Sequence, residues 1–257
     1  MPGADGGATG VGELLADLAA EQRDLQEVLT RLDADQWLAP TPARGWDVRD
    51  TVSHLADTDE MATATATGKP GSLNDRSAVS ASGEDVTYTG VLRGRRKSGA
   101  EVLQWWESSA DALHDMFVAL DPNERVPWGI GMRAPSLVTA RLMETWAHGL
   151  DVRAAVGVPA EDTDRLAHVA WLATRALPYA YSVAGREPPP DPLRVELTLP
   201  SGATWTLGPN DTANRITGPA GEYCRVFVHR ALLTDAPHVF AEGPAAADAL
   251  AVARAFL

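Results

Sequence analysis

The stretch RLMETWAHGLD, residues 141–151, combines an apolar helix with a regular line of polar side chains. Its polar residues follow one another at steps of three, four and three positions: Arg141, Glu144, His148 and Asp151. At about 3.6 residues per helical turn, these side chains project from one side of the helix. Because the remaining positions are mostly apolar, we expect this helix to be packed nearly all round and its polar line to meet an interior cavity.

Glu144 and His148 are one helical turn apart, which places their Cβ atoms about 6 Å from each other. A carboxylate and an imidazole at this spacing can bind one divalent ion without bending the helix. The same spacing also occurs in ordinary Glu–His pairs on solvated helix faces, where it contributes only about 0.2–0.5 kcal/mol. The apolar neighbours favour the metal interpretation, which needs a third ligand from another part of the chain.

His54 differs in context from the other histidines that could supply this ligand. It lies in DVRDTVSHLADTDE (47–60), beside the apolar stripe of Val48, Val52 and Leu55. The remaining candidates lie in surface-like or C-terminal contexts: His114, His168, His229 and His238. A histidine beside an apolar stripe is also common in a packed core, so the residue pattern alone leaves both interpretations of His54 open.

Composition and charge exclude several classes of function. The chain has 257 residues, 45% of them hydrophobic, and a net charge of −13, with no basic run longer than RGRRK at 93–97. We therefore expect neither a nucleic acid nor a membrane as partner. The single cysteine, Cys224, excludes an intramolecular disulfide and a cysteine-rich zinc site. With no signal-peptide pattern and no apolar run of about 18 residues, we expect a cytoplasmic protein.

Helical periodicity and loop signals predict five helices in the first part of the chain. They are expected over residues 11–32, 47–67, 98–120, 136–156 and 163–184, with Asp47, Ser98 and Ser136 as N-caps and a kink at Pro178. Residues 68–97 show no sustained period and are predicted to be a long connection that partly covers a site.

A second domain is predicted after the proline-rich segment AGREPPPDP, residues 184–192. Beyond it, alternating residues predict a hairpin over 193–207, followed by a helix around 218–232, a strand near HVFAEG (238–243) and a helix over 244–257. The expected fold class is α+β, with a helical domain over residues 11–184 and a small α+β domain over residues 193–257.

Two segments of the chain together resemble a known family. TPARGWDVRDTVSHLADTDEMA (41–62) and ARLMETWAHGLDV (140–152) are similar to the DinB-like metalloenzyme superfamily, and more specifically to the mycothiol-dependent maleylpyruvate isomerase family of actinobacteria. The family pattern is Gly-Trp-x-Val-(Arg)-Asp-x3-His-Leu, followed on a later helix by Glu-x3-His-x2-Asp. NRITGPAGEYCRVFVHRA (214–231) resembles the tail of that family, so the similarity covers most of the chain.

The resemblance implies a DinB-like four-helix bundle whose core metal is held by His54, Glu144 and His148. Two imidazoles and one carboxylate suit Zn²⁺ and leave a coordination position open. In this interpretation Asp151 orients a ligand or holds the amine of a bound thiol cofactor. Arg141 pairs with Glu144 or binds a substrate carboxylate.

Further roles follow from the same resemblance. Trp146 is expected to line the pocket, and Arg230 to bring a basic group toward the metal. The segment that holds Arg230 carries fewer basic residues than the tails of related chains. Trp46 and Asp47, which begin the second predicted helix, are interpreted as structural, as a hydrophobic staple and an N-cap.

Three functions are compatible with these residues. The first is a metal-dependent enzyme that uses mycothiol and acts as an isomerase or S-transferase on a small electrophile. Its chemistry would follow from metal coordination, which deprotonates a thiol whose pKa is otherwise about 8.5. The second uses metal-bound water for hydrolysis or lyase chemistry, with Asp57 as a base. The third is a metal-binding or small-molecule-binding protein without catalysis. We expect a small substrate and a low-molecular-weight thiol as partners, and a monomer or homodimer.

Overall fold

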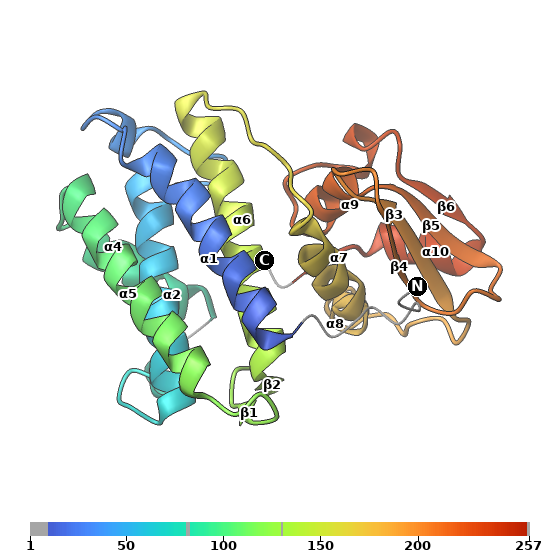
Figure 1. Ribbon diagram of the computed structural model, residues 1–257, viewed down its shortest axis with the longest axis horizontal. Coiled ribbons are helices and arrows are strands. Elements are labelled where there is room, and N and C mark those ends of the chain that lie inside the picture. The colour runs from blue at the N-terminus through green and yellow to red at the C-terminus, as the bar shows by residue number, and fades with distance from the viewer. Residues whose placement is uncertain (1–9, 81–82, 130, 256–257) are drawn as a thin grey trace. The chain divides into compact units, whose positions relative to one another are not determined.

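The computed structural model describes residues 10–80, 83–129 and 131–255. It forms two compact units that divide between Ala160 and Glu161. The first unit is mainly helical, and the second combines helices with a four-stranded sheet (Figure 1). The predicted α+β class is confirmed.

Among the described residues, four long helices build the first unit. They are α1 (Val11–Leu29), α2 (Val48–Thr67), α5 (Gly99–Ala119) and α6 (Ala134–Val156). Helix α2 packs against α5 and α6, and α1 packs against the same two helices, which closes a four-helix bundle (Figure 1). Its buried core includes Leu25, Val52, Leu55, Trp106 and Val152, so the predicted bundle is confirmed.

Two of the three predicted N-caps are confirmed. Asp47 accepts a hydrogen bond from the backbone N–H of Asp50 at 2.7 Å, and Ser98 likewise caps α5, each within a capping box. The prediction for Ser136 is wrong, because α6 begins at Ala134 with Arg133 as its N-cap. A proline lies in the first turn of α6, where its fixed φ and its missing N–H are tolerated.

The segment 68–97, predicted as a long connection, contains two helices, α3 (Leu73–Val79) and α4 (Gly83–Gly94). Helix α4 packs closely on α2. A Cβ at Gly90 would lie 2.4 Å from the Cβ of Asp57, and a Cβ at Gly94 would lie 1.7 Å from the Oγ of Ser53. The contact face of α4 therefore includes glycines, which carry no hydrophobic periodicity that a sequence pattern could detect.

Short elements complete the first unit. The 3₁₀ helix η1 (Gln36–Leu38) lies in the loop before α2, and the strands β1 (Arg125–Val126) and β2 (Met132–Arg133) pair in antiparallel fashion before α6. Helix α6 ends at Gly157, whose φ of 70° provides the left-handed C-cap that favours glycine. No helix among the described residues combines the length and the apolar character needed to span a bilayer.

The second unit begins earlier than the predicted small domain. Residues 163–184 were expected to form one kinked helix of the N-terminal domain, but they form α7 (Leu166–Arg175) and α8 (Leu177–Val183), with Pro178 in the first turn of α8. Helix α7 packs against α9 (Ala220–Phe227). This packing places α7 and α8 with the C-terminal unit, so the proline-rich segment is a loop within that unit rather than its boundary.

A four-stranded sheet lies at the centre of the second unit. Its strands are β3 (Leu193–Thr198), β4 (Thr204–Leu207), β5 (Asn214–Pro219) and β6 (Phe240–Glu242), in the order β4-β3-β5-β6 (Figure 1). The predicted β3–β4 hairpin and the strand near HVFAEG are present. Strand β5, which runs parallel to β3, was not predicted. Helix α9 packs on β3 and β5, and α10 (Pro244–Ala251) packs on β5 and β6, while the 3₁₀ helix η2 (Leu233–Asp235) precedes β6.

Candidate metal centre

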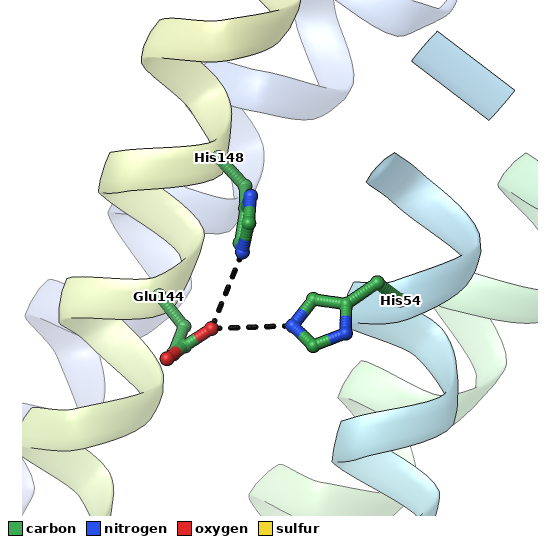
Figure 2. Close-up of side chains that lie close together, drawn as sticks. All are labelled: His54, Glu144 and His148. Atoms are coloured by element: carbon green, nitrogen blue, oxygen red, sulfur yellow. Dashed lines mark hydrogen bonds and ion pairs between the residues drawn. The ribbon is translucent and has the colours of Figure 1, made fainter. Parts of the chain in front are cut away.

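Three side chains from α2 and α6 converge in the first unit (Figure 2). The Nε2 atoms of His54 and His148 each lie 3.4 Å from Oε2 of Glu144. The two imidazole centroids are 4.9 Å apart, and one donor atom from each of the three residues lies within 4.8 Å of the others. The structure thus brings together His54, Glu144 and His148 from segments that are distant in the sequence.

Two of the three separations between these donor atoms fit a divalent metal. Zinc–nitrogen and zinc–oxygen bonds are about 2.0–2.2 Å long, so two ligand atoms on a tetrahedral zinc ion lie about 3.3–3.6 Å apart. Both separations of 3.4 Å between an imidazole Nε2 and Oε2 of Glu144 fall in this range. Two imidazoles and one carboxylate, with no thiolate, also suit Zn²⁺ and related first-row ions.

Burial and neighbouring groups together set the charge states of the three candidate ligands. His54 and His148 are 7% and 5% exposed. Burial lowers the pKa of His54, which favours the neutral imidazole that metals bind. Burial by itself would raise the pKa of Glu144, but hydrogen bonds and charge interactions with His148 and His54 outweigh it and hold the Glu144 pKa well below its ordinary value. The site therefore offers an ionised carboxylate beside a neutral His54.

Asp151 lies behind one of the histidines. Its Oδ2 is 3.2 Å from Nδ1 of His148, and the carboxylate is 2% exposed. In metal sites, a carboxylate on the far nitrogen of a histidine fixes the tautomer and the ring orientation. Asp151 contacts a candidate ligand, and its predicted role of orienting that ligand stays a prediction.

Arg141 contacts α2 rather than Glu144. Its Nε donates to Oδ1 of Asp59 at 2.8 Å, and its Nη2 donates to Oγ1 of Thr58 at 2.9 Å. The guanidinium is 3% exposed, so this ion pair is buried between the two helices that carry the candidate ligands. The expected pairing of Arg141 with Glu144 is corrected, because Asp59 on the neighbouring helix provides the nearer carboxylate.

Asp57 does not have the surroundings of a general base. Its two carboxylate oxygens accept hydrogen bonds from Arg76 and Arg93, and the side chain is 1% exposed. Arg93 also pairs with Glu60 at 2.8 Å. Asp57 thus joins the 68–97 segment to α2 through two ion pairs. Because both of its carboxylate oxygens are bound by guanidinium groups, its predicted role as a base is corrected.

Trp46 lies at the candidate site, a position that the sequence did not predict. Its ring centroid lies 5.1 Å from that of His54 and 6.1 Å from that of His148. The sequence signal was its place directly before the N-cap of α2, which we interpreted only as a staple. Trp146, expected to line the pocket, is 6% exposed and lies two positions from both Glu144 and His148, on another side of α6. Its pocket role stays a prediction.

The second unit contains the remaining candidates. Arg230 donates from Nη1 to the backbone oxygen of Val228 at 2.7 Å, and its predicted role at the metal stays a prediction. Cys224 is fully buried, and burial raises the pKa of its thiol above the ordinary value. A neutral, enclosed thiol is a weak nucleophile.

The fold and the site define a helical-bundle protein with a candidate metal centre of two histidines and one glutamate. The family model described as the mycothiol maleylpyruvate isomerase N-terminal domain matches residues 18–153, which include all three candidate ligands. The chain belongs to this family, as the sequence resemblance predicted.

Two curated proteins and two solved structures are similar to nearly the whole chain. The uncharacterized proteins MT0041 and Rv0036c, from two strains of Mycobacterium tuberculosis, are each 39% identical over 246 residues, which is 95% of this chain and 95% of theirs. The crystal structure of the mycothiol-dependent maleylpyruvate isomerase matches with a TM-score of 0.61 at 16% identity, and a mutant of it matches with a TM-score of 0.62 at 15% identity. Both matches cover 94% of this chain and 98% of the other, which extends the fold likeness beyond the bundle.

Proposed function

We propose that this chain is a metal-dependent enzyme of the mycothiol-dependent maleylpyruvate isomerase type. It acts on a small electrophilic substrate, as an isomerase or as an S-transferase, with mycothiol as the thiol cofactor. The observation that carries the proposal is the convergence of His54, Glu144 and His148, whose donor atoms lie within 4.8 Å of one another. Family membership supports the isomerase class and the thiol cofactor.

His54, Glu144 and His148 would hold the metal as three protein ligands, and this ligand set suits Zn²⁺. A zinc ion bound in this way supplies an open position at which a thiol is deprotonated at neutral pH. Glu144 contributes the negative charge of the ligand set, and Asp151 keeps Nε2 of His148 directed at Glu144 by holding its Nδ1.

The thiol must come from outside the chain. Cys224 is the single cysteine of the sequence, it is fully buried, and burial raises its pKa. A low-molecular-weight thiol is therefore the reasonable nucleophile, in agreement with the cofactor named for the solved relatives. Water-based hydrolysis is less well supported, since Asp57, the base proposed for it, is bound by two arginines.

Metal content and thiol response test this proposal. Purified wild-type protein should contain one equivalent of zinc by elemental analysis, and the visible spectrum of the Co²⁺-substituted protein should change when mycothiol is added. His148→Ala should lose stoichiometric metal while far-UV circular dichroism shows that the helices remain. His114→Ala, a histidine on α5 outside the candidate ligand set, is the matched control and should retain the metal.

Two results would contradict the proposal. A full equivalent of zinc in His148→Ala removes this ligand assignment. A Co²⁺ spectrum that responds to pH and not to mycothiol removes the thiol chemistry and leaves the water-based alternative.

A further inference from the structure

The two histidines of the candidate metal centre are held in different ways. Nδ1 of His148 lies 3.2 Å from Oδ2 of Asp151. Nδ1 of His54 is buried and has no hydrogen-bond partner among the residues that the structure describes. A hydrogen bond at Nδ1 can therefore restrain the His148 ring on the side away from Glu144, whereas on that side of the His54 ring the restraint must come from packing.

The indole of Trp46 provides this packing. Its centroid lies 5.1 Å from that of His54 with the rings tilted at 48°, and 6.1 Å from that of His148 with the rings at 24°. Both separations are in the range of about 4.5–7 Å at which aromatic rings attract one another. Trp46 is partly exposed whereas both imidazoles are buried, so the indole is the most solvent-accessible of the three rings.

The loop that presents Trp46 has a fixed backbone. The Trp46 carbonyl accepts hydrogen bonds from the N–H and the Oγ1 of Thr41 at 2.9 and 3.1 Å, and its N–H donates to the carbonyl of Ala43 at 3.0 Å. Nη2 of Arg95 donates to the carbonyl of Gly45 at 3.2 Å, and Gly45 has a φ of 81° that favours glycine. A fixed backbone limits the indole to the few rotamers that Trp46 can adopt at this point of the loop.

We propose that Trp46 is a positioning residue of the metal centre, which holds the ring of His54 with its Nε2 directed at Glu144. It acts on His54 through ring packing, as Asp151 acts on His148 through a hydrogen bond. The proposal rests on the metal-dependent function proposed above. Without the indole, the His54 ring can leave its rotamer and the ligand geometry loosens.

Co²⁺ binding to metal-free protein tests this role with spectroscopic readouts. Wild type, Trp46→Ala, Trp46→Phe and the control Trp128→Phe are each titrated with Co²⁺ and followed by visible absorption and by tryptophan fluorescence. Trp128 is also partly exposed. It precedes the start of α6 at Ala134, which lies about 15 Å along the helix axis from Glu144.

Trp46→Ala should bind Co²⁺ about tenfold more weakly than wild type, with an altered visible spectrum, as expected when a group that orients a ligand is removed. Trp46→Phe should restore the affinity, because phenylalanine keeps a ring against His54. Both variants should lose the part of the Co²⁺-dependent quenching of tryptophan fluorescence that comes from Trp46, and Trp128→Phe should retain the full quenching.

Distinct outcomes separate this proposal from the proposed function. Wild-type Co²⁺ affinity and an unchanged spectrum in Trp46→Ala overturn the role of Trp46 and leave the metal centre intact. If Trp46→Ala does not fold, Trp46→Phe provides the test: Co²⁺-dependent quenching of its tryptophan fluorescence equal to that of wild type overturns the role of Trp46. If the wild-type protein binds no stoichiometric Co²⁺, both the metal centre and the role of Trp46 are wrong.

Discussion

The interiors of the two units differ in the residues that they bury. Inside the bundle, His54, Asp59 and Arg141 are 7%, 1% and 3% exposed. In the second unit, the largest fully buried side chains are Tyr223 and Phe227, whose rings pack 4.6 Å apart. The charged pair of Asp162 and Arg225 in the second unit is more accessible, with side chains about a quarter exposed, and Arg194, which pairs with Glu196, is 8% exposed.

This difference indicates where the chemistry lies. Removing an ionised group from water costs several kcal/mol unless partners compensate for it, so a protein core ordinarily avoids charges. The second unit comes close to such a core: among its described residues Arg194 is the buried charge, it is paired with Glu196, and the cysteine is enclosed. The bundle instead holds charged groups between α2 and α6, which is reasonable when those groups serve a site.

The buried Arg141–Asp59 pair provides the largest expected effect on stability. Arg141→Ala leaves the Asp59 carboxylate buried without its cation, and breaking such a pair costs about 3–5 kcal/mol. Urea unfolding of the metal-free protein measures the change. A loss below about 1 kcal/mol would show that the bundle interior tolerates Asp59 without its cation, and the difference in buried charge between the two units would then matter less for stability than we infer.

Asp151→Ala tests the hydrogen bond to His148 rather than the fold. Loss of a carboxylate that orients a metal-binding histidine typically weakens metal affinity about 10–100-fold, and Asp151 lies 3.2 Å from Nδ1 of His148. Competition with a chromophoric chelator measures the zinc affinity. Glu161→Ala, an exposed carboxylate, is the control and should bind zinc as wild type does. Equal affinities in the two variants would contradict the orienting role of Asp151.

The pH dependence of the metal-free protein should reflect the buried His54. Burial lowers the pKa of His54 below 6.5, its ordinary value in the unfolded chain. Below pH 6.5 His54 binds a proton in the unfolded chain but not in the folded protein. The free energy of unfolding should therefore fall as the pH falls.

Urea unfolding at pH 7.5 and 5.5 in the presence of a chelator measures this effect, with His54→Gln as the comparison. The variant should lose less stability on acidification than wild type does. If the two proteins respond equally, His54 does not contribute to the pH dependence.

The smallest effect is expected at the accessible ion pair of the second unit. Arg225 donates to both oxygens of Asp162, at 2.7 and 2.8 Å, from a partly exposed position. Arg225→Ala should destabilise the protein by about 1 kcal/mol or less, because water screens the pair. A loss as large as that of Arg141→Ala, measured in the same unfolding assay, would remove the contrast between the two interiors.

Several features of the fold and of the candidate site were predictable because they are local. Apolar periodicity predicted the four bundle helices, and Asp47 and Ser98 revealed the starts of two of them. The spacing of Glu144 and His148 follows from the helical repeat alone. The apolar neighbours of His54 made it a candidate metal ligand, but the same pattern is also typical of a histidine in a packed core. The family resemblance favoured the ligand interpretation.

The remaining features depend on contacts between segments that are distant in the sequence. The pairing of β5 with β3 and the close packing of α4 on α2 leave little periodic signal in the chain. The partner of Arg141 was decided by which carboxylate of α2 lies opposite it, and the contact of Trp46 with two histidines by the loop before α2. The sequence by itself determined which side chains each helix offers, since helical periodicity is local. Only the tertiary structure decided which of them meet, because packing joins residues that the chain keeps far apart.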